Sequence, residues 1–134
     1  MNLNKENLKS ILKNVSSIAL IGASSNPERD SYKVMKFLIS KGYEVFPVNP
    51  NHADSEILGK KCFSNLKDIE QKIDMVDIFR AKEFVMEITQ AAIKTGVAVI
   101  WTQEGIVDKK SSQLAKDSDI IFVMNECPKK VLEN

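Results

Sequence analysis

Near the N-terminus the chain reads Ile18-Ala19-Leu20-Ile21-Gly22-Ala23-Ser24-Ser25-Asn26-Pro27-Glu28-Arg29-Asp30-Ser31-Tyr32. The apolar run that ends at Ile21 is typical of a buried parallel strand, and Gly22 permits a tight turn into a helix. Backbone N–H groups at such a turn and at the helix N-terminus attract phosphate, and the helix dipole favours negative charge there. Ser24 and Ser31 add hydroxyl groups, and Arg29 adds a fixed positive charge. The stretch therefore predicts a site for a nucleotide-like ligand.

A simpler interpretation of the same turn stays open. A glycine followed by a serine is common where a strand meets a helix, with no ligand involved. Pro27, Arg29 and Ser31 follow within the same short loop, so several groups that can contact an anion converge there. This convergence favours phosphate contact over a plain turn.

Length and composition predict a single globular domain spanning residues 1–134. The chain has 134 residues, of which 43% are apolar and 28% charged, and its net charge is +1. Such a balance predicts no broad attraction to nucleic acid or to an anionic membrane. No apolar run approaches the ~20 residues that a membrane span needs, and residues 1–14 resemble an amphipathic helix rather than a signal peptide. We therefore expect a cytoplasmic protein.

The two cysteines, Cys62 and Cys127, are widely separated and predict neither a disulfide framework nor a zinc site. We expect Cys127 to be an inert structural thiol. The single histidine, His52, is expected in solvent because no acidic partner is evident for it.

Strands and helices alternate along the chain. Apolar runs predict strands over Ser17–Ile21, Tyr43–Val48, Met75–Phe79, Val97–Trp101 and Ile120–Met124. Helical spacing predicts helices over 31–41 and 82–95, which end at Gly42 and Gly96, and a shorter helix to residue 116 capped by Asp108. Residues 49–71 look irregular, with one turn near 66–70. This pattern predicts an α/β protein: a doubly wound, Rossmann-like, five-stranded parallel sheet flanked by helices, in the order 3-2-1-4-5.

In such sheets ligands bind beyond the carboxyl ends of the strands, where the strand order reverses. Polar, glycine or aromatic residues gather at these tips: Gly22, Ala23 and Ser24, then Asn49 and Pro50, Phe79 and Arg80, and finally Trp101, Gln103 and Gly105. Alternatives remain for several of them. Arg80 fits a solvated side chain, an ion pair or a second phosphate contact, and Asn49 fits a rigid loop entry as well as a ligand contact. Trp101 fits a core residue as well as a ligand-lining one.

Several familiar nucleotide sites are disfavoured by what the sequence lacks. A full G-x-G-x-x-G fingerprint is absent, and no acidic residue ends the second strand at Val48-Asn49-Pro50 to hold ribose hydroxyls, so NAD is disfavoured. A G-x-x-x-x-G-K-[ST] loop is also absent, which excludes P-loop hydrolysis. Neither paired carboxylates nor a Ser-His-Asp arrangement can be assembled, so no residue receives a catalytic role.

Short motifs in a fixed order carry a family resemblance from about Val15 to Cys127. They are Ile21-Gly22-Ala23-Ser24, Pro27, Arg29, Ser31-Tyr32, Gly42-Tyr43, Pro47-Val48-Asn49-Pro50, Ile57-Leu58-Gly59, Val76-Asp77-Ile78-Phe79-Arg80 and Trp101-x-Gln103-x-Gly105. Together they resemble the small stand-alone CoA-binding proteins of bacteria and archaea, a family similar in fold to the CoA-binding domain of the succinyl-CoA synthetase α subunit.

The resemblance implies that coenzyme A lies across the strand tips. Gly22, Ser24, Arg29 and Ser31 would then meet its phosphates, with Ala23, Pro27 and Tyr32 in the same motif. Asn49 and Pro50 would border the nucleotide, and Phe79 and Arg80 would lie along the cleft. Trp101 and Gln103 would face the pantetheine arm, with Gly105 in the same loop. The chain departs from the synthetase in having no domain for a phosphorylated histidine, and in Lys129-Lys130 where a glycine is expected after Cys127-Pro128.

The resulting hypothesis is a module that binds coenzyme A or an acyl-CoA without catalysis of its own. The alternative is a subunit or partner of an acyl-CoA or nucleotide-dependent transferase or ligase. A third interpretation is a regulatory module whose affinity for a partner changes with CoA. Since single-domain Rossmann proteins often pair, a homodimer or a protein partner is part of these expectations, whereas nucleic acid, membrane and metal are not.

Overall fold

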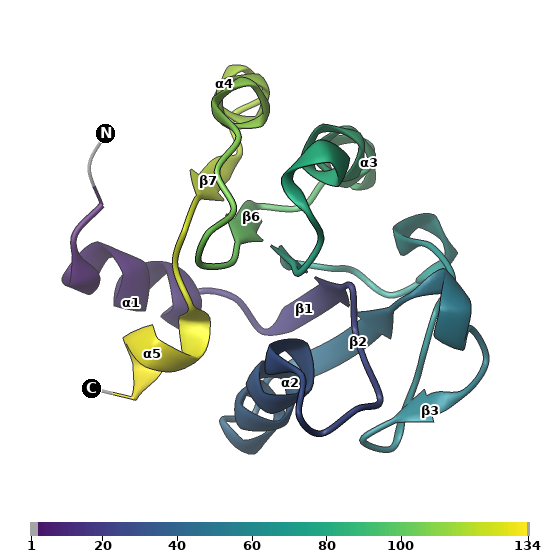
Figure 1. Ribbon diagram of the computed structural model, residues 1–134. Helices are drawn as coiled ribbons and strands as arrows, with labels where there is room; N and C mark the ends of the chain where they lie inside the picture. Colours follow the sequence, from purple (N-terminus) through teal and green to yellow (C-terminus); the bar gives the residue numbers. More distant parts are fainter. Residues whose placement is uncertain (1–2, 134) are drawn as a thin grey trace.

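Five parallel strands form one sheet in residues 3–133, which are the residues that the computed structural model describes (Figure 1). Their order across the sheet is β2-β1-β5-β6-β7. Their bounds are β1 (Ser17–Ile21), β2 (Glu44–Val48), β5 (Met75–Ile78), β6 (Val99–Thr102) and β7 (Ile121–Val123). The predicted α/β class and all five predicted strands are confirmed, with strand ends that move by at most two residues.

The predicted strand order is wrong. The third strand, β5, pairs with β1 through the register Ile18↔Met75 to Ile21↔Ile78, instead of lying outside β2. Pro47 gives the physical reason, because a proline has no N–H for a ladder and belongs in an edge strand. The outer edge of β2 is also partly occupied, since the Phe63 N–H donates to the Pro47 carbonyl at 2.9 Å. Strand β2 is therefore an edge strand, and the order reverses between β1 and β5.

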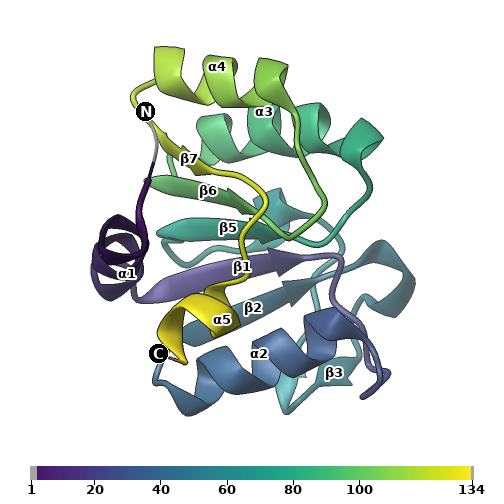
Figure 2. The same ribbon diagram turned by 60° about the vertical axis from the view of Figure 1, so that its left-hand side comes forward.

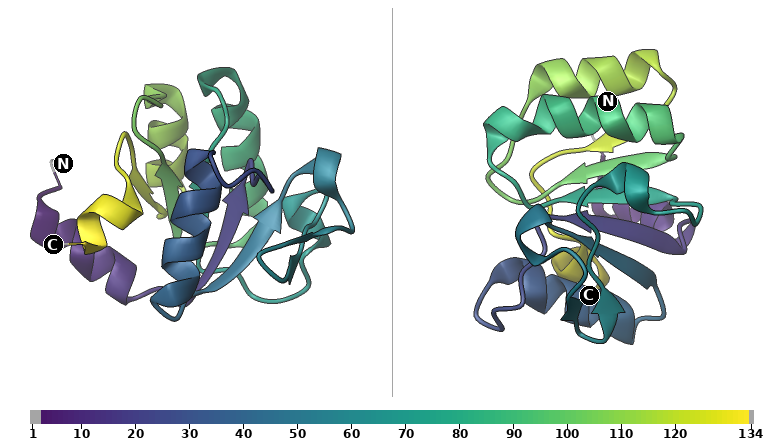
Figure 3. Two further views of the ribbon diagram at one scale, coloured as in Figure 1. Left: turned by 60° about the horizontal axis from the view of Figure 1, so that its bottom comes forward. Right: turned by 90° about the vertical axis from the view of Figure 1, so that its right-hand side faces the viewer.

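Helices cover both faces of the sheet (Figures 2 and 3). On one face lie α1 (Lys5–Lys13), α2 (Asp30–Ser40) and α5 (Pro128–Leu132), and on the other lie α3 (Val85–Thr95) and α4 (Lys109–Asp117). The core is divided accordingly: Leu12, Leu38 and Val131 pack with Trp101 under the first group, while Ala92 and Ala115 belong to the cluster under the second. The sheet is thus buried on both faces, which explains the continuous apolar strands.

Most helix ends agree with the sequence. Helix α2 ends before Gly42 and α3 ends at Gly96, and both glycines have positive φ, of 95° and 84°. The N-terminal helix begins at Lys5 instead of residue 1, behind a capping box formed by Asn4 and Asn7; residues 1 and 2 lie outside the described range. Asp108 precedes α4 as expected, but its carboxylate accepts from the Ser111 hydroxyl and makes no capping bond to the backbone.

Short elements fill the segments that looked irregular. Between β2 and β5 the chain forms η1 (Pro50–His52), the two-stranded antiparallel pair β3 (Glu56–Ile57) and β4 (Lys60–Lys61), and η2 (Leu66–Asp68), which is the turn expected there. The predicted helix over 82–95 begins as a 3₁₀ turn, η3 (Lys82–Phe84). Helix α5 was not predicted; Pro128 stands at its first position, where a missing N–H costs nothing.

The carboxyl ends of the parallel strands meet at one edge of the sheet, and the loops after them carry the candidate site residues. In residues 3–133 no helix combines the length and apolarity that crossing a bilayer demands.

Candidate functional site

The turn after β1 approaches the backbone immediately after β5 very closely. Gly22 has a φ of +94°, and a Cβ at this position would lie 2.4 Å from the Phe79 carbonyl oxygen. No other residue fits here without moving backbone, because the obstacle is a main-chain atom and positive φ disfavours side chains. The glycine is therefore required by the packing of two strands, whether or not a ligand binds beside it.

The first amides of this turn are bonded within the protein. The N–H groups of Gly22 and Ala23 both donate to the Val48 carbonyl, at 2.9 and 3.2 Å. The expectation that backbone N–H groups at the turn point at an anion is wrong for these two, because they satisfy the end of β2 instead. Their function is to fix the turn against its neighbouring strand.

The loop that follows is a chain of small hydrogen-bonded turns. The Ser24 hydroxyl accepts from the Asn26 N–H, and the Asn26 side-chain oxygen accepts from the Glu28 N–H, each at 3.0 Å. The Arg29 N–H donates to the Asn26 carbonyl at the same distance. These bonds give the polar loop a defined path to the start of α2.

The N-terminus of α2 is the strongest anion-attracting feature of the site. Arg29 occupies the N-cap position, and no side chain in the described structure caps this helix. The first amides of an α-helix have no partner within the helix, so those of Asp30, Ser31 and Tyr32 offer donors together with the positive end of the dipole. Ser31 is buried at this end, whereas Arg29 is exposed. Phosphate capture by α2 is thus chemically available even though the turn amides are occupied.

Asn49 braces the opposite side of the turn. Its side-chain N–H donates to the Ala23 carbonyl at 2.8 Å, and its side-chain oxygen accepts from the Asn51 N–H at 2.9 Å. Both ends of the amide are therefore engaged, which favours the loop-entry interpretation of this residue over a direct ligand contact. Pro50 is exposed at the start of η1.

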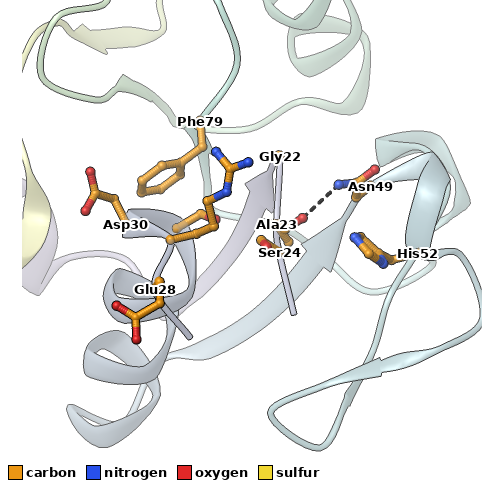
Figure 4. A pocket seen from close by; sticks show the side chains of 10 residues that line it. Gly22, Ala23, Ser24, Glu28, Asp30, Asn49, His52 and Phe79 are labelled. Atoms are coloured by element: carbon orange, nitrogen blue, oxygen red, sulfur yellow. Dashed lines mark hydrogen bonds between the residues drawn. The ribbon is translucent and has the colours of Figure 1, made fainter. Parts of the chain in front are cut away.

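These elements enclose a pocket of about 470 Å³ (Figure 4). In Figure 4, Glu28 and Asp30 stand on the α2 side of the turn, while Asn49 and His52 stand on the other side. The structure brings together half of the expected site residues in this lining: Gly22, Ala23, Ser24, Arg29, Ser31, Asn49 and Phe79. It also adds Glu28, Asp30 and His52, which the sequence analysis did not place in the site. His52 is half-buried here rather than fully in solvent.

The charges around the pocket are mixed. The Arg29 guanidinium is accompanied by the carboxylates of Glu28 and Asp30, so the lining is not a simple basic patch. A ligand that suits it carries an anionic group for Arg29 and the α2 amides, and also hydrogen-bond donors for the carboxylates. A phosphorylated ligand with hydroxyl or amino groups meets both demands.

The other expected residues do not line the pocket. Pro27 and Tyr32 belong to the same motif but lie outside the lining, as does Pro50. Arg80 lies beside the Gly22 turn, and the carbon of its guanidinium is 4.1 Å from the centroid of the Phe84 ring. Its charge is thus stacked on an aromatic face rather than directed into the pocket.

The loop after β6 is tied to the loop after β7. Trp101 is wholly buried, and its indole N–H donates to the Glu126 carbonyl at 2.9 Å, so the core interpretation of Trp101 holds and its expected role beside a ligand does not fit. The Gly105 N–H donates to the Asn125 side-chain oxygen at 2.6 Å, which places this glycine in a bracing contact. These two hydrogen bonds hold the end of β6 and the loop after it against the loop that follows β7.

Asp77 is a buried ionisable group that was not among the expected site residues. It lies fully buried in β5, and its Oδ1 accepts from the side-chain Nε2 of Gln103 at 2.7 Å. Burial raises the pKa of Asp77 to about 7, and the Gln103 bond opposes that rise only in part. A charge inside the apolar run Met75-Val76-Asp77-Ile78 was the signal that could have identified it.

The cysteines are free and buried. Burial raises the pKa of the Cys127 thiol, against the opposing effect of hydrogen bonds from the backbone of Lys130 and Lys129. A raised pKa keeps a thiol protonated and unreactive, which agrees with the structural role expected for Cys127.

Comparison with known proteins relates this chain to a known family. Residues 16–133 match the family model described as a CoA binding domain. The uncharacterized protein YneT of Bacillus subtilis is 36% identical over 128 residues, or 96% of this chain and 93% of that protein. A hypothetical protein from Pyrococcus horikoshii OT3 has the same fold, with a TM-score of 0.93, 40% identity, and coverage of 98% of this chain and 92% of that one.

A larger relative is an enzyme subunit. The α subunit of ADP-forming acetate–CoA ligase I from Pyrococcus furiosus is 36% identical over 91 residues, which are 65% of this chain. The matched region is 20% of that subunit, so the chain corresponds to about a fifth of the ligase subunit's length.

Proposed function

Because this chain belongs to the CoA-binding domain family, we propose that it binds coenzyme A or an acyl-CoA at the carboxyl ends of its strands. The observation that carries the proposal is the pocket at the uncapped N-terminus of α2, where Arg29 and Ser31 meet the turn after β1. This is the place at which the strand order reverses, between β1 and β5.

The pocket suits the nucleotide end of such a ligand. The α2 amides and the Arg29 guanidinium would hold the phosphates, and the Ser31 hydroxyl would donate a further hydrogen bond. The carboxylates of Glu28 and Asp30 would accept from hydroxyl or amino groups of the nucleotide. Phe79 offers an aromatic face for a planar base.

We propose binding without catalysis. The groups that line the pocket include no nucleophile paired with a base, and His52 has no carboxylate partner among the ion pairs of residues 3–133 that would orient it as a base. A second candidate function is that of a subunit or partner of a larger acyl-CoA ligase, and the ligase relative favours it because this chain corresponds to only a fifth of that subunit. Purification of the native protein discriminates the two: a ligase partner would co-purify and confer turnover of acyl-CoA.

The first test is to identify the ligand. Mass spectrometry of small molecules released from the freshly purified protein, followed by calorimetric titration with CoA, acetyl-CoA, NAD and ATP, should recover CoA and show saturable binding of CoA or acetyl-CoA. Binding of NAD or ATP in the absence of CoA binding would contradict the proposal.

Replacing Arg29 with glutamine should weaken CoA binding about tenfold, since a charge-assisted hydrogen bond contributes about 1.5–3 kcal/mol and about 1.4 kcal/mol corresponds to a factor of ten. Arg29 is exposed and makes no side-chain capping bond, so the fold should tolerate the change. The matched control is Lys36→Gln, which removes an exposed cation from the same helix outside the pocket. Equal affinities of the two variants in low-salt calorimetry would remove Arg29 from the site.

A further inference from the structure

Asp77 and Gln103 form a buried polar pair at the centre of the sheet. The strand register places Asp77 between Leu20 of β1 and Trp101 of β6, both of which are fully buried. Its Oδ1 accepts from Gln103 Nε2 at 2.7 Å, while its Oδ2 has no hydrogen-bond partner within the described structure. An apolar side chain of the same shape would avoid the cost of this burial, which points to a use for the carboxyl group.

The pair determines which way the Gln103 amide faces. Gln103 Nε2 donates to Asp77 Oδ1, which accepts whether the carboxyl group is ionised or protonated on Oδ2, and Gln103 Oε1 therefore faces the other way. Among residues 3–133 no hydrogen bond to Oε1 is formed, yet Oε1 is not one of the fully enclosed unpaired atoms. Gln103 therefore presents a free acceptor that reaches solvent, although the residue as a whole is only 7% exposed.

Gln103 itself does not line the pocket but stands at the strand tip next to it. Ile78 pairs with Thr102 in the sheet, and the Gln103 N–H donates to the Ile78 carbonyl at 3.3 Å, so Gln103 and Phe79 are neighbours at adjacent strand tips. Phe79 lines the pocket. A ligand that extends from the pocket past Phe79 along the sheet edge thus arrives at Gln103.

We propose that Asp77 is a positioning residue, which holds Gln103 so that its Oε1 accepts a hydrogen bond from an amide N–H of the pantetheine arm of CoA. This inference rests on the proposed function, and it adds a specificity determinant for the arm as distinct from the nucleotide. The arm carries secondary amides, whereas the nucleotide end is held by the pocket at α2. Gln103 would contact the ligand, and Asp77 would act only through Gln103.

The test separates the arm from the nucleotide. Affinities for CoA and for an adenosine bisphosphate that lacks the arm are measured by calorimetry on the full chain and on the variants Asp77→Leu, Asp77→Asn and Gln103→Leu. Loss of one oriented hydrogen bond corresponds to about a tenfold change. Asp77→Leu and Gln103→Leu should therefore each weaken CoA binding about tenfold and leave the bisphosphate unaffected.

Two further variants distinguish positioning from a structural effect. Asp77→Asn should retain CoA affinity, because an asparagine oxygen still accepts from Gln103 Nε2. The double variant Asp77→Leu/Gln103→Leu should bind CoA no more weakly than Gln103→Leu alone, because Asp77 acts only through that side chain.

The outcomes are distinguishable. Unchanged CoA affinity in folded Asp77→Leu, or an equal loss for CoA and the bisphosphate, would overturn the positioning role while leaving the proposed function intact. A wild-type protein that binds neither ligand would overturn both.

Discussion

Replacing Asp77 with asparagine is expected to stabilise the protein near and above neutral pH. Burial raises the pKa of Asp77 to about 7, while an unfolded aspartate has a pKa of ~3.9. The folded state therefore holds a proton that the unfolded state has released between these values, so the wild-type protein loses stability as the pH rises through this window. The loss amounts to about 1.4 kcal/mol per pH unit, or about 4 kcal/mol in all.

The asparagine variant lacks this titration and keeps an acceptor for Gln103. The free energy of unfolding of the variant minus that of the wild type should therefore increase between about pH 4 and pH 7 and stay constant above. Urea denaturation at several pH values measures this difference, in which the other titrating groups cancel. A difference that does not change with pH would show that the Asp77 carboxyl has an ordinary pKa in the folded state.

Asp74 supplies the matched control. Its Oδ2 accepts from the Ser16 N–H at 2.8 Å, and this bond lowers the pKa of Asp74. A lowered pKa stabilises the folded state above the unfolded pKa, and that stability is lost on acidification. The Asp74→Asn variant should accordingly show the opposite sign: a loss of stability at neutral pH that disappears in acid.

Replacing Gly22 with alanine is expected to destabilise the protein by about 3 kcal/mol, from the left-handed backbone conformation and the crowding of an added methyl group. The φ of +94° disfavours any side chain, and the Cβ would lie 2.4 Å from the carbonyl oxygen of Phe79. Since that oxygen belongs to the backbone directly after β5, relief requires the ends of β1 and β5 to separate. Urea denaturation and the midpoint of thermal unfolding both report this loss.

Gly96→Ala is the control for backbone conformation alone. Gly96 has a φ of +84°, but nothing lies within 4 Å of an added Cβ. Its loss should be about 1–2 kcal/mol, which is the cost of a left-handed non-glycine residue. If the free energy of unfolding falls by the same amount in both variants, the close approach of the Phe79 carbonyl to Gly22 does not contribute to the loss. Weaker ligand binding by a Gly22 variant would therefore be explained by the distorted turn and would not by itself show that Gly22 contacts a phosphate.

The sequence predicted the strands well because the sheet is buried on both faces and its strands are continuous apolar runs. Helix ends at Gly42 and Gly96 were also predictable, because each glycine takes the positive φ that terminates a helix. Strand order was not read correctly, although Pro47 carried the information: a strand that contains a proline belongs at an edge. Apolar periodicity identifies a strand but does not say which strands pair, so the strand order has to be inferred from single residues such as Pro47.

The candidate site was predictable in part. Most of the site residues expected between Gly22 and Ser31 do line the pocket. They were predictable because few backbone conformations connect the first strand to the helix that follows it. The Gly22 and Ala23 amides were misassigned because their partner, Val48, is remote in sequence and becomes adjacent only in the sheet. His52 joins the pocket for the same reason, through the fold of the segment after β2.

The outer edge of β2 has a consequence for the behaviour of the protein in concentrated solution. An unpaired strand edge is a template on which another chain can add a strand, and this is a common route to β-aggregation. Here Pro47 lacks an N–H, the Phe63 segment occupies hydrogen-bonding groups near the end of the strand, and exposed Glu44 places a charge at its start. This edge therefore offers no continuous ladder to a second molecule, and the residues that fix the strand order also protect the protein from templated association.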